Sequence, residues 1–191
     1  MRTALITDLH ANREAVEAVL AHAGGQRIDA WVLLGDFVGY GADPAWVVDI
    51  VIDLVRQGAV AVQGNHDAAV VRGAAPGMRP DARYVIEWTR SRLSAEQIAF
   101  LDSLPLSATD GERLYLHANA WHPPGWEYVA GRSDAMRSMM ATDCRYTFLG
   151  HMHDPRLYNL SSTGKIGDFV PTAGVAIPVP PHRQWLVVPG S

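Results

Sequence analysis

Five short groups of polar residues carry side chains that can bind metal ions. They are Asp8-Leu9-His10, Gly35-Asp36, the run from Gly64 to Asp67, His117, and the run from Gly150 to His153. Each group follows a short apolar run that is typical of a buried strand. Ligands of open α/β sheets bind outside the carboxyl ends of the strands. We therefore expect the five groups to meet at one edge of the fold.

The spacing inside two of these groups favours a shared metal site. Residues at i and i+2 of an extended segment point to the same side, so Asp8 with His10, and His151 with His153, can each direct two donors at one point. Carboxylate, imidazole and amide oxygen together suit Mn²⁺, Fe²⁺ or Zn²⁺. The pattern predicts a site for divalent cations.

Each group taken alone has a simpler explanation. A Gly-Asp pair after a strand is usually a turn, the segment from Asn65 to Asp67 can cap a helix, and His117 alone is typical of a buried core histidine. The coincidence argues otherwise, since five of the eight histidines stand at expected strand ends beside carboxylates and glycines. His22, His122 and His182 do not share this pattern, and we interpret them as surface or loop residues.

The first third of the chain alternates strand and helix patterns. Strands are expected at residues 3–7, 31–34 and 59–62. One helix follows the capping residue Asn12, and a second opens at Asp43-Pro44, where proline suits the first helical position. This order predicts a parallel sheet with helices on its faces.

The remaining elements indicate a second, more antiparallel sheet. Helices are expected at residues 81–93 and 94–104, the latter with Ser94 and Gln97 at capping-box spacing, and at residues 133–140, capped by Ser133. Asp110-Gly111 is a hairpin signal. Further strands are expected at residues 113–117, 145–149, 156–160, 166–170 and 184–188. We expect two packed sheets covered by helices.

Composition limits the classes of partner. The 191 residues are 48% hydrophobic and 19% charged, with a formal net charge of -4. This balance disfavours a sequence-independent grip on long nucleic acids but allows a small phosphorylated substrate. There is one cysteine, and no apolar segment is long enough to cross a membrane. We expect a cytoplasmic protein without membrane or stable nucleic-acid partners.

The ordered set DLH, GD, GNHD, LHA and GHMH resembles the calcineurin-like metallophosphoesterase superfamily. The fragment GDFVGYGADP is similar to a small bacterial phosphoesterase branch. The resemblance implies an α/β fold: a four-layer α/β/β/α sandwich with two mixed sheets and a dinuclear metal site at the carboxyl ends of strands. Residues 1–191 are expected to form a single domain. The terminal WLVVPGS resembles a strand and turn that continue in relatives, which leaves open whether a C-terminal segment is missing.

The resemblance also assigns roles to matching positions. It implies two divalent ions (Mn, Fe or Zn), a catalytic pair made of His66 and Asp67, and a ligand set shared between the ions. His66 would act as general acid, and Asp67 would orient it. The first ion would be held by Asp8, His10 and His153, the second by Asn65, His117 and His151, and Asp36 would bridge both.

The implied reaction is hydrolysis of a phosphate ester. Metal-activated hydroxide would attack phosphorus in line with the leaving oxygen, which His66 would protonate. Tyr40 and Gln63 stand where Ser/Thr phosphoprotein phosphatases carry arginine, so we expect a phosphodiester or a nucleotide. The alternatives are a phosphomonoesterase, including a phosphoprotein phosphatase, and a non-catalytic binding module. The substrate, the native metal and the oligomeric state stay open.

Three aromatic residues after His117 leave two interpretations open. Trp121, Trp126 and Tyr128 follow a ligand-bearing strand, so they could overhang the site and stack on a flat group. They could equally pack the loop against the sheet.

Overall fold

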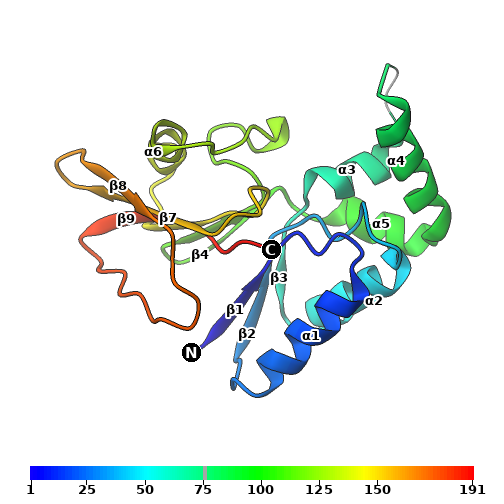
Figure 1. Ribbon diagram of the computed structural model, residues 1–191, viewed down its shortest axis with the longest axis horizontal. Coiled ribbons are helices and arrows are strands. Elements are labelled where there is room, and N and C mark those ends of the chain that lie inside the picture. Colours follow the sequence, from blue (N-terminus) through cyan, green and yellow to red (C-terminus); the bar gives the residue numbers. More distant parts are fainter. Residues whose placement is uncertain (75–76) are drawn as a thin grey trace.

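The computed structural model describes residues 1–74 and 77–191. Within these residues the strands form a parallel sheet, in the order β1-β2-β3, and a mixed sheet, in the order β4-β5-β6-β9-β7-β8. Figure 1 shows the two sheets side by side, with α1 and α2 outside the first and α6 outside the second. The elements, in chain order, are β1 (Thr3–Ile6), α1 (Arg13–Gly24), β2 (Ala30–Leu33), α2 (Pro44–Arg56), β3 (Val60–Ala61), α3 (Asn65–Arg72), α4 (Pro80–Arg92), α5 (Ala95–Ser103), β4 (Ser107–Asp110), β5 (Arg113–Leu116), the 3-10 turn η1 (Pro123–Gly125), α6 (Arg132–Met140), β6 (Tyr146–Phe148), β7 (Arg156–Ser161), β8 (Ile166–Phe169) and β9 (Arg183–Val188).

Local signals place three helix starts where the sequence predicts them. The Asn12 side chain accepts the backbone N–H of Ala15 at 3.1 Å and so caps α1. Pro44 begins α2, and Ser94 and Gln97 form the predicted capping box of α5. These caps satisfy backbone donors that the first helical turn leaves unpaired.

One predicted cap is wrong. Ser133 lies inside the first turn of α6, because that helix begins at Arg132 and its N-cap is Gly131. Asp134 accepts the N–H of Ala130 just before the helix, at 3.1 Å. The helix therefore starts one residue before the predicted cap, and no side chain caps it.

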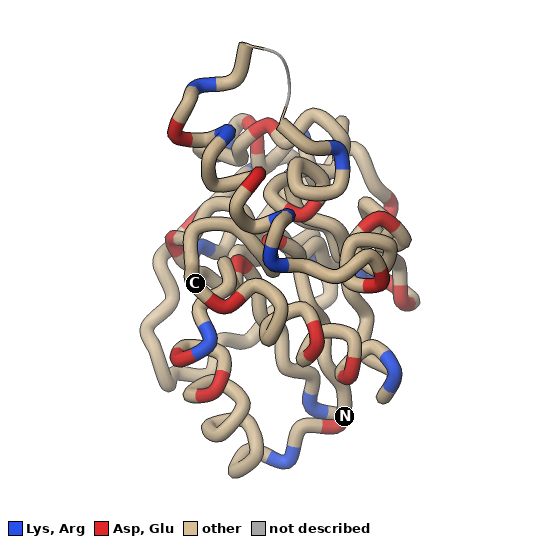
Figure 2. The backbone as a smooth tube through the Cα atoms, turned by 90° about the vertical axis from the view of Figure 1, so that its right-hand side faces the viewer, with Lys and Arg blue, Asp and Glu red and all other residues tan. Residues whose placement is uncertain are grey.

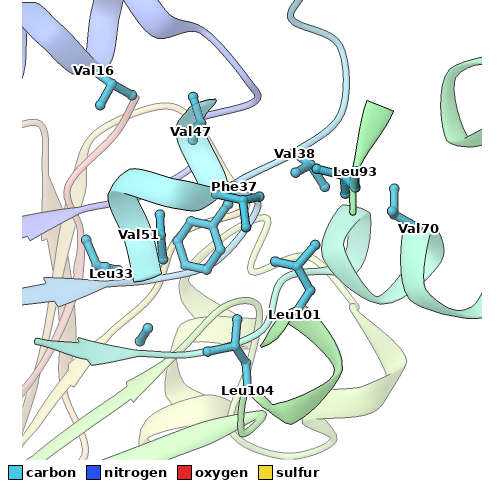
Figure 3. Close-up of a cluster of buried hydrophobic side chains, with 12 residues drawn as sticks. Val16, Leu33, Phe37, Val38, Val47, Val51, Val70, Leu93, Leu101 and Leu104 are labelled. Carbon is cyan, nitrogen blue, oxygen red and sulfur yellow. The ribbon is translucent and has the colours of Figure 1, made fainter. Parts of the chain in front are cut away.

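Apolar clusters between successive layers establish the sandwich. One lies between the parallel sheet and its helices, around Phe37, Val51 and Leu101 (Figure 3). Another joins the two sheets and includes Val32 of the first and Tyr115 of the second. A further cluster lies between the mixed sheet and α6. Helix, sheet, sheet and helix follow in that order, which confirms the α/β class and the α/β/β/α layers.

The two sheets differ in strand direction. The expectation was two mixed sheets, but the described strands of the first are all parallel, because helical crossovers join β1 to β2 and β2 to β3. In the second, β5, β6 and β9 run parallel, and antiparallel partners flank them. Strands β1, β2, β3, β5 and β6 each lead into one of the five polar groups. The sheets thus carry those groups to one common edge.

The distribution of charged residues and the lengths of the helices match what the composition predicts. Figure 2 shows Lys and Arg interspersed with Asp and Glu along the chain. No helix among residues 1–74 and 77–191 has the length and apolar character to span a membrane.

Candidate metal centre

The loops after the strands hold backbone in a region that side chains rarely adopt. Non-glycine residues with φ between 45° and 66° gather at this edge: Asp8, His10, Ala11, Asp36, Tyr40, His151 and His153. Each such residue costs on the order of 1–3 kcal/mol and persists only where its surroundings enforce it. Strain concentrated on the predicted ligands marks this edge as a functional site.

Asp67 holds two of these loops together. It is fully buried, and its carboxylate accepts the backbone N–H groups of Asp36 (2.9 Å), Phe37 (2.9 Å), Val38 (3.2 Å) and Gly64 (2.9 Å). These described hydrogen bonds of Asp67 all run to the backbone, and its expected role of orienting the His66 ring stays a prediction. Asp67 fixes the positions of the loops after β2 and β3.

The first donor set comprises Asp8, His10 and His153, whose ligand atoms lie within 4.8 Å of one another. Nε2 of His10 and Nε2 of His153 are 3.3 Å apart, and Asp8 Oδ1 lies 3.4 Å from the His153 nitrogen. Asp8 is held by the Thr7 hydroxyl, which donates to Oδ2 at 2.6 Å, and by the backbone N–H of His151. These donors suit one borderline divalent cation.

The second donor set comprises Asp36, His117 and His151, also within 4.8 Å. Asp36 Oδ2 lies 3.2 Å from His117 Nε2 and 3.9 Å from His10 Nε2, so this carboxylate faces both sets. Asn65 Oδ1 is 3.0 Å from the same His117 nitrogen. The seven residues expected as ligands are thus brought to one place.

Backbone carbonyls fix the orientation of three of the histidine rings. Nδ1 of His117 lies 2.7 Å from the carbonyl of Leu34, and Nδ1 of His10 lies 3.2 Å from that of Val38. Nε2 of His151 lies 3.0 Å from the carbonyl oxygen of Trp126. Since a carbonyl only accepts, each of these nitrogens carries a proton, which leaves the other ring nitrogen to serve as a ligand. Metal-binding histidines are commonly supported in this way.

The buried carboxylates of the centre favour a positive charge beside them. Burial alone would lower the pKa of His117, but its hydrogen bond to Asp36 and the charge of that carboxylate raise the pKa to about 9. Burial would raise the pKa of Asp36, yet the contact with His117 brings the net pKa below its usual value. Without a metal, a proton on His117 thus supplies the positive charge that a cation would provide. The donor chemistry and this demand both fit divalent metal.

Asp67 titrates in a different environment from these groups. Burial and the nearby charge of Asp36 raise its pKa to about 7, although the backbone N–H donors act against the shift. A cation beside Asp36 would offset part of that repulsion. Metal binding is therefore electrostatically linked to the Asp67 carboxylate that holds the loops after β2 and β3.

His66 lies beside one member of each donor set. Its backbone N–H donates to Asp36 Oδ1 at 2.8 Å, and its ring meets the edge of His10 at a centroid distance of 5.0 Å. Burial lowers the pKa of His66. Gly39 is required beside it, because a Cβ there would come 2.5 Å from His66 Nδ1. His66 also forms a compact group with His10 and Asp36, so its geometry permits either a proton donor or a metal ligand.

The three aromatic residues after β5 divide between the two interpretations. Trp121 packs against the core under α6, with the guanidinium of Arg137 over its ring. Tyr128 stacks on His151 at a centroid distance of 4.1 Å, and Trp126 meets the edge of His117. Packing thus describes Trp121, whereas the other two border the metal centre.

The three histidines that the sequence pattern excluded from the site lie elsewhere. Several groups that hold the ligands in place could not be identified from the sequence. His22, His122 and His182 are exposed, as expected. No sequence pattern pointed to the Thr7 hydroxyl. None could point to the carbonyls of Leu34, Val38 and Trp126, because every residue has a backbone carbonyl.

Comparisons with known proteins agree with this geometry. The calcineurin-like phosphoesterase superfamily domain matches residues 1–191. The chain belongs to the calcineurin-like phosphoesterase superfamily. A metallophosphoesterase from Sphaerobacter thermophilus is 34% identical, with a TM-score of 0.84, over 100% of this chain and 76% of that one. A hypothetical protein from Pyrococcus horikoshii shares the fold at 15% identity and a TM-score of 0.74, over 99% of this chain and 76% of that one.

Among curated sequences, an uncharacterized protein of Methanocaldococcus jannaschii is 37% identical over 131 residues, which are 66% of this chain and 53% of that protein. The chain thus spans about half the length of this curated relative. Superfamily membership agrees with the ordered motifs, the two packed sheets and the donor sets at their common edge.

Proposed function

We propose that this chain is a metal-dependent hydrolase of phosphate esters that acts on a phosphodiester or a nucleotide. The observation that carries the proposal is the position of Asp36, a carboxylate only 1% exposed that faces donors of both sets. Two cations close together repel strongly, and a carboxylate between them offsets part of that repulsion.

The ligand roles follow from this arrangement. Asp8, His10 and His153 would hold one ion, while Asn65, His117 and His151 would hold the other, with Asp36 shared. When bound, the ions would acidify a water molecule and withdraw charge from the phosphate oxygens. The strained loops and the carbonyl-fixed rings would keep the donors in place before substrate arrives.

His66 would complete the reaction as general acid. Hydrolysis joins a water oxygen to phosphorus and breaks the bond to the ester oxygen, which departs with a proton. His66 lies beside His10 and Asp36, one member of each donor set, so its ring can deliver that proton. Such a group typically accelerates a reaction about 10²–10⁴-fold.

Two side chains support a diester or nucleotide over a phosphoprotein. Gln63 is buried and donates to the carbonyl oxygen of Leu101 at 2.8 Å, so it faces the core. Tyr40 is 69% exposed, and its phenol carries no positive charge. Neither position offers the bidentate cation that a phosphate dianion favours.

A metal-reconstitution panel tests this proposal. The chain is loaded separately with Mn²⁺, Fe²⁺, Zn²⁺ and Mg²⁺, and each form is assayed on phosphodiesters, nucleotides and phosphomonoesters. We expect two ions per chain by elemental analysis and metal-dependent hydrolysis with a preference for diesters or nucleotides. One ion or none per loaded chain would contradict the dinuclear centre, and full metal loading without any hydrolysis would contradict the enzyme.

A further inference from the structure

A cavity of about 460 Å³ opens beside His66, at the margin of the metal centre. Among the described residues, its walls include Tyr40, the proposed ligand Asn65, and Ala82, Val85 and Ile86 on α4. This volume lies in the range of small-molecule sites. The cavity therefore joins the proposed proton donor to an apolar helix face.

Tyr40 forms the wall of this cavity nearest the metal centre. It is 69% exposed, although its φ of 64° is one that a bulky residue rarely adopts. Its ring packs against His10 and His66, at centroid distances of 4.7 and 4.6 Å. Strain that presents a large exposed ring over a reactive centre indicates a role in holding substrate.

The position of His66 decides which part of the substrate enters the cavity. A general acid must reach the oxygen that departs, so the group attached to that oxygen lies on the His66 side of phosphorus. The cavity that His66 lines is therefore the place for the leaving alcohol.

The charges around the cavity indicate what kind of alcohol it accepts. Its charged lining residues, Arg79 and Asp81, pair with each other at 2.9 Å, so their charges balance. A polyphosphate leaving group would need unpaired cations. An apolar helix face opposite an aromatic ring instead suits a flat, uncharged ring.

We infer that the cavity between Tyr40 and α4 binds a flat, uncharged aromatic group on the leaving alcohol, with the size and stacking chemistry of a nucleobase. This inference rests on the proposed function, because His66 as proton donor sets the orientation. Tyr40 acts as a specificity-determining platform, and Val85 closes the cavity from α4.

Two esters that differ in the leaving alcohol test the inference. The probes are methyl 2-(1-naphthyl)ethyl phosphate and ethyl methyl phosphate, with kcat/KM measured from release of the longer alcohol. Their leaving alcohols have similar acidity, so the kcat/KM ratio reports binding of the ring. We expect the wild type to prefer the naphthyl ester by about tenfold or more, as stacking on an aromatic side chain allows.

Four variants locate the ring. Tyr40→Ala keeps the left-handed backbone but removes the platform, and should reduce the ratio about tenfold, whereas Tyr40→Phe should preserve it. Ala82→Trp fills the cavity from exposed α4 and should bring the ratio near one. Tyr84→Ala is the matched control, since Tyr84 is 68% exposed but lines the neighbouring hollow beyond Val85. It should leave the ratio unchanged.

The outcomes separate this inference from the proposed function. A wild-type ratio near one, or an equal loss on both esters in Tyr40→Ala, overturns the inference while hydrolysis persists. A loss in Tyr84→Ala as large as in Tyr40→Ala would place the ring in the other hollow and also overturn it. Binding of 2-(1-naphthyl)ethanol, followed by its fluorescence on the metal-loaded chain, gives a readout without turnover. Binding that Ala82→Trp abolishes, without hydrolysis of either ester, would support the cavity and contradict the enzyme.

Discussion

The parallel sheet and the mixed sheet each contribute donors to the metal centre, but they hold them differently. In the parallel sheet, Asp67 ties the loops after β2 and β3 to each other through backbone N–H groups. After the mixed sheet, His117 and His151 each have a partner across the interface: the Leu34 carbonyl supports the first, and Asp8 accepts the N–H of the second, whose ring is also held by the Trp126 carbonyl of its own half. The parallel half thus ties its own loops together, and both mixed-half histidines also bond across to it.

We therefore expect substitutions in the two halves to differ in how many of the two ions they affect. Loss of a group in the parallel half should disturb both ions, because the donors of the other half are oriented against it. Loss of a donor at the rim of the mixed half should stay local. His153, whose side chain is 48% exposed, is such a rim donor.

The largest expected effect is that of Asp36→Ala. Its carboxylate faces both donor sets, so we expect loss of both ions and of activity, beyond the roughly 10²–10³-fold cost of losing a single electrostatic contact. Elemental analysis and kcat/KM on a phosphodiester measure this. Retention of one ion at wild-type affinity would contradict the shared role.

His66→Ala should show a loss that depends on the leaving group. An alkoxide departs poorly without a proton, so an alkyl ester should lose about 10²–10⁴-fold in kcat/KM, whereas a nitrophenyl ester should lose much less. Both esters are compared at matched metal occupancy. Metal content near that of the wild type is part of the prediction, and a clear fall in it would make His66 a ligand.

His153→Ala should weaken one ion and spare the other. Its rim position leaves Asp8, His10 and Asp36 in place, so we expect a loss of about 10–100-fold in affinity for a single ion, which is the scale of an altered metal site. Competition with a chelator measures the two affinities separately. Equal loss of both ions would remove the distinction between the halves.

Asp67→Asn should act on stability and leave the leaving-group preference unchanged. An amide cannot accept every backbone N–H that the carboxylate holds, so we expect the free energy of unfolding to fall by about 3 kcal/mol. Urea unfolding of the metal-free chain measures this. Asp49→Asn is the control, since Asp49 is an exposed acceptor on α2 whose bond comes from Gln97, and its loss should cost under about 0.5 kcal/mol. A selective loss on alkyl esters in Asp67→Asn would support an orienting role toward His66.

Much of the fold followed from local patterns. The cap at Asn12, the proline that begins α2, the box at Ser94 and the hairpin at Asp110-Gly111 act within a few residues, so sequence spacing was enough to predict them. The cap at Ser133 failed, because the helix begins one residue earlier, after Gly131. The single-domain organisation and the cytoplasmic location stay predictions.

The residues that make up the candidate site could be predicted from the sequence. The groups that hold those residues in place mostly could not. The order of the motifs predicted which residues gather, since strands in parallel carry their following loops to one edge. The orienting role of Asp67, which the resemblance implied, stays a prediction. What the sequence did not indicate is that the fold brings the loop after β2 under the same carboxylate.

The sequence by itself determined the types of donor, their order along the chain and the sheet edge at which they meet. These depend on residue chemistry and on short-range periodicity, which are fixed before the chain folds. Only the tertiary structure decided which ring nitrogen is free to bind metal, which carboxylate faces both sets, and that Tyr40 stands exposed beside a cavity. Such properties arise from backbone carbonyls and strained loops brought together from distant segments, and no single segment encodes them.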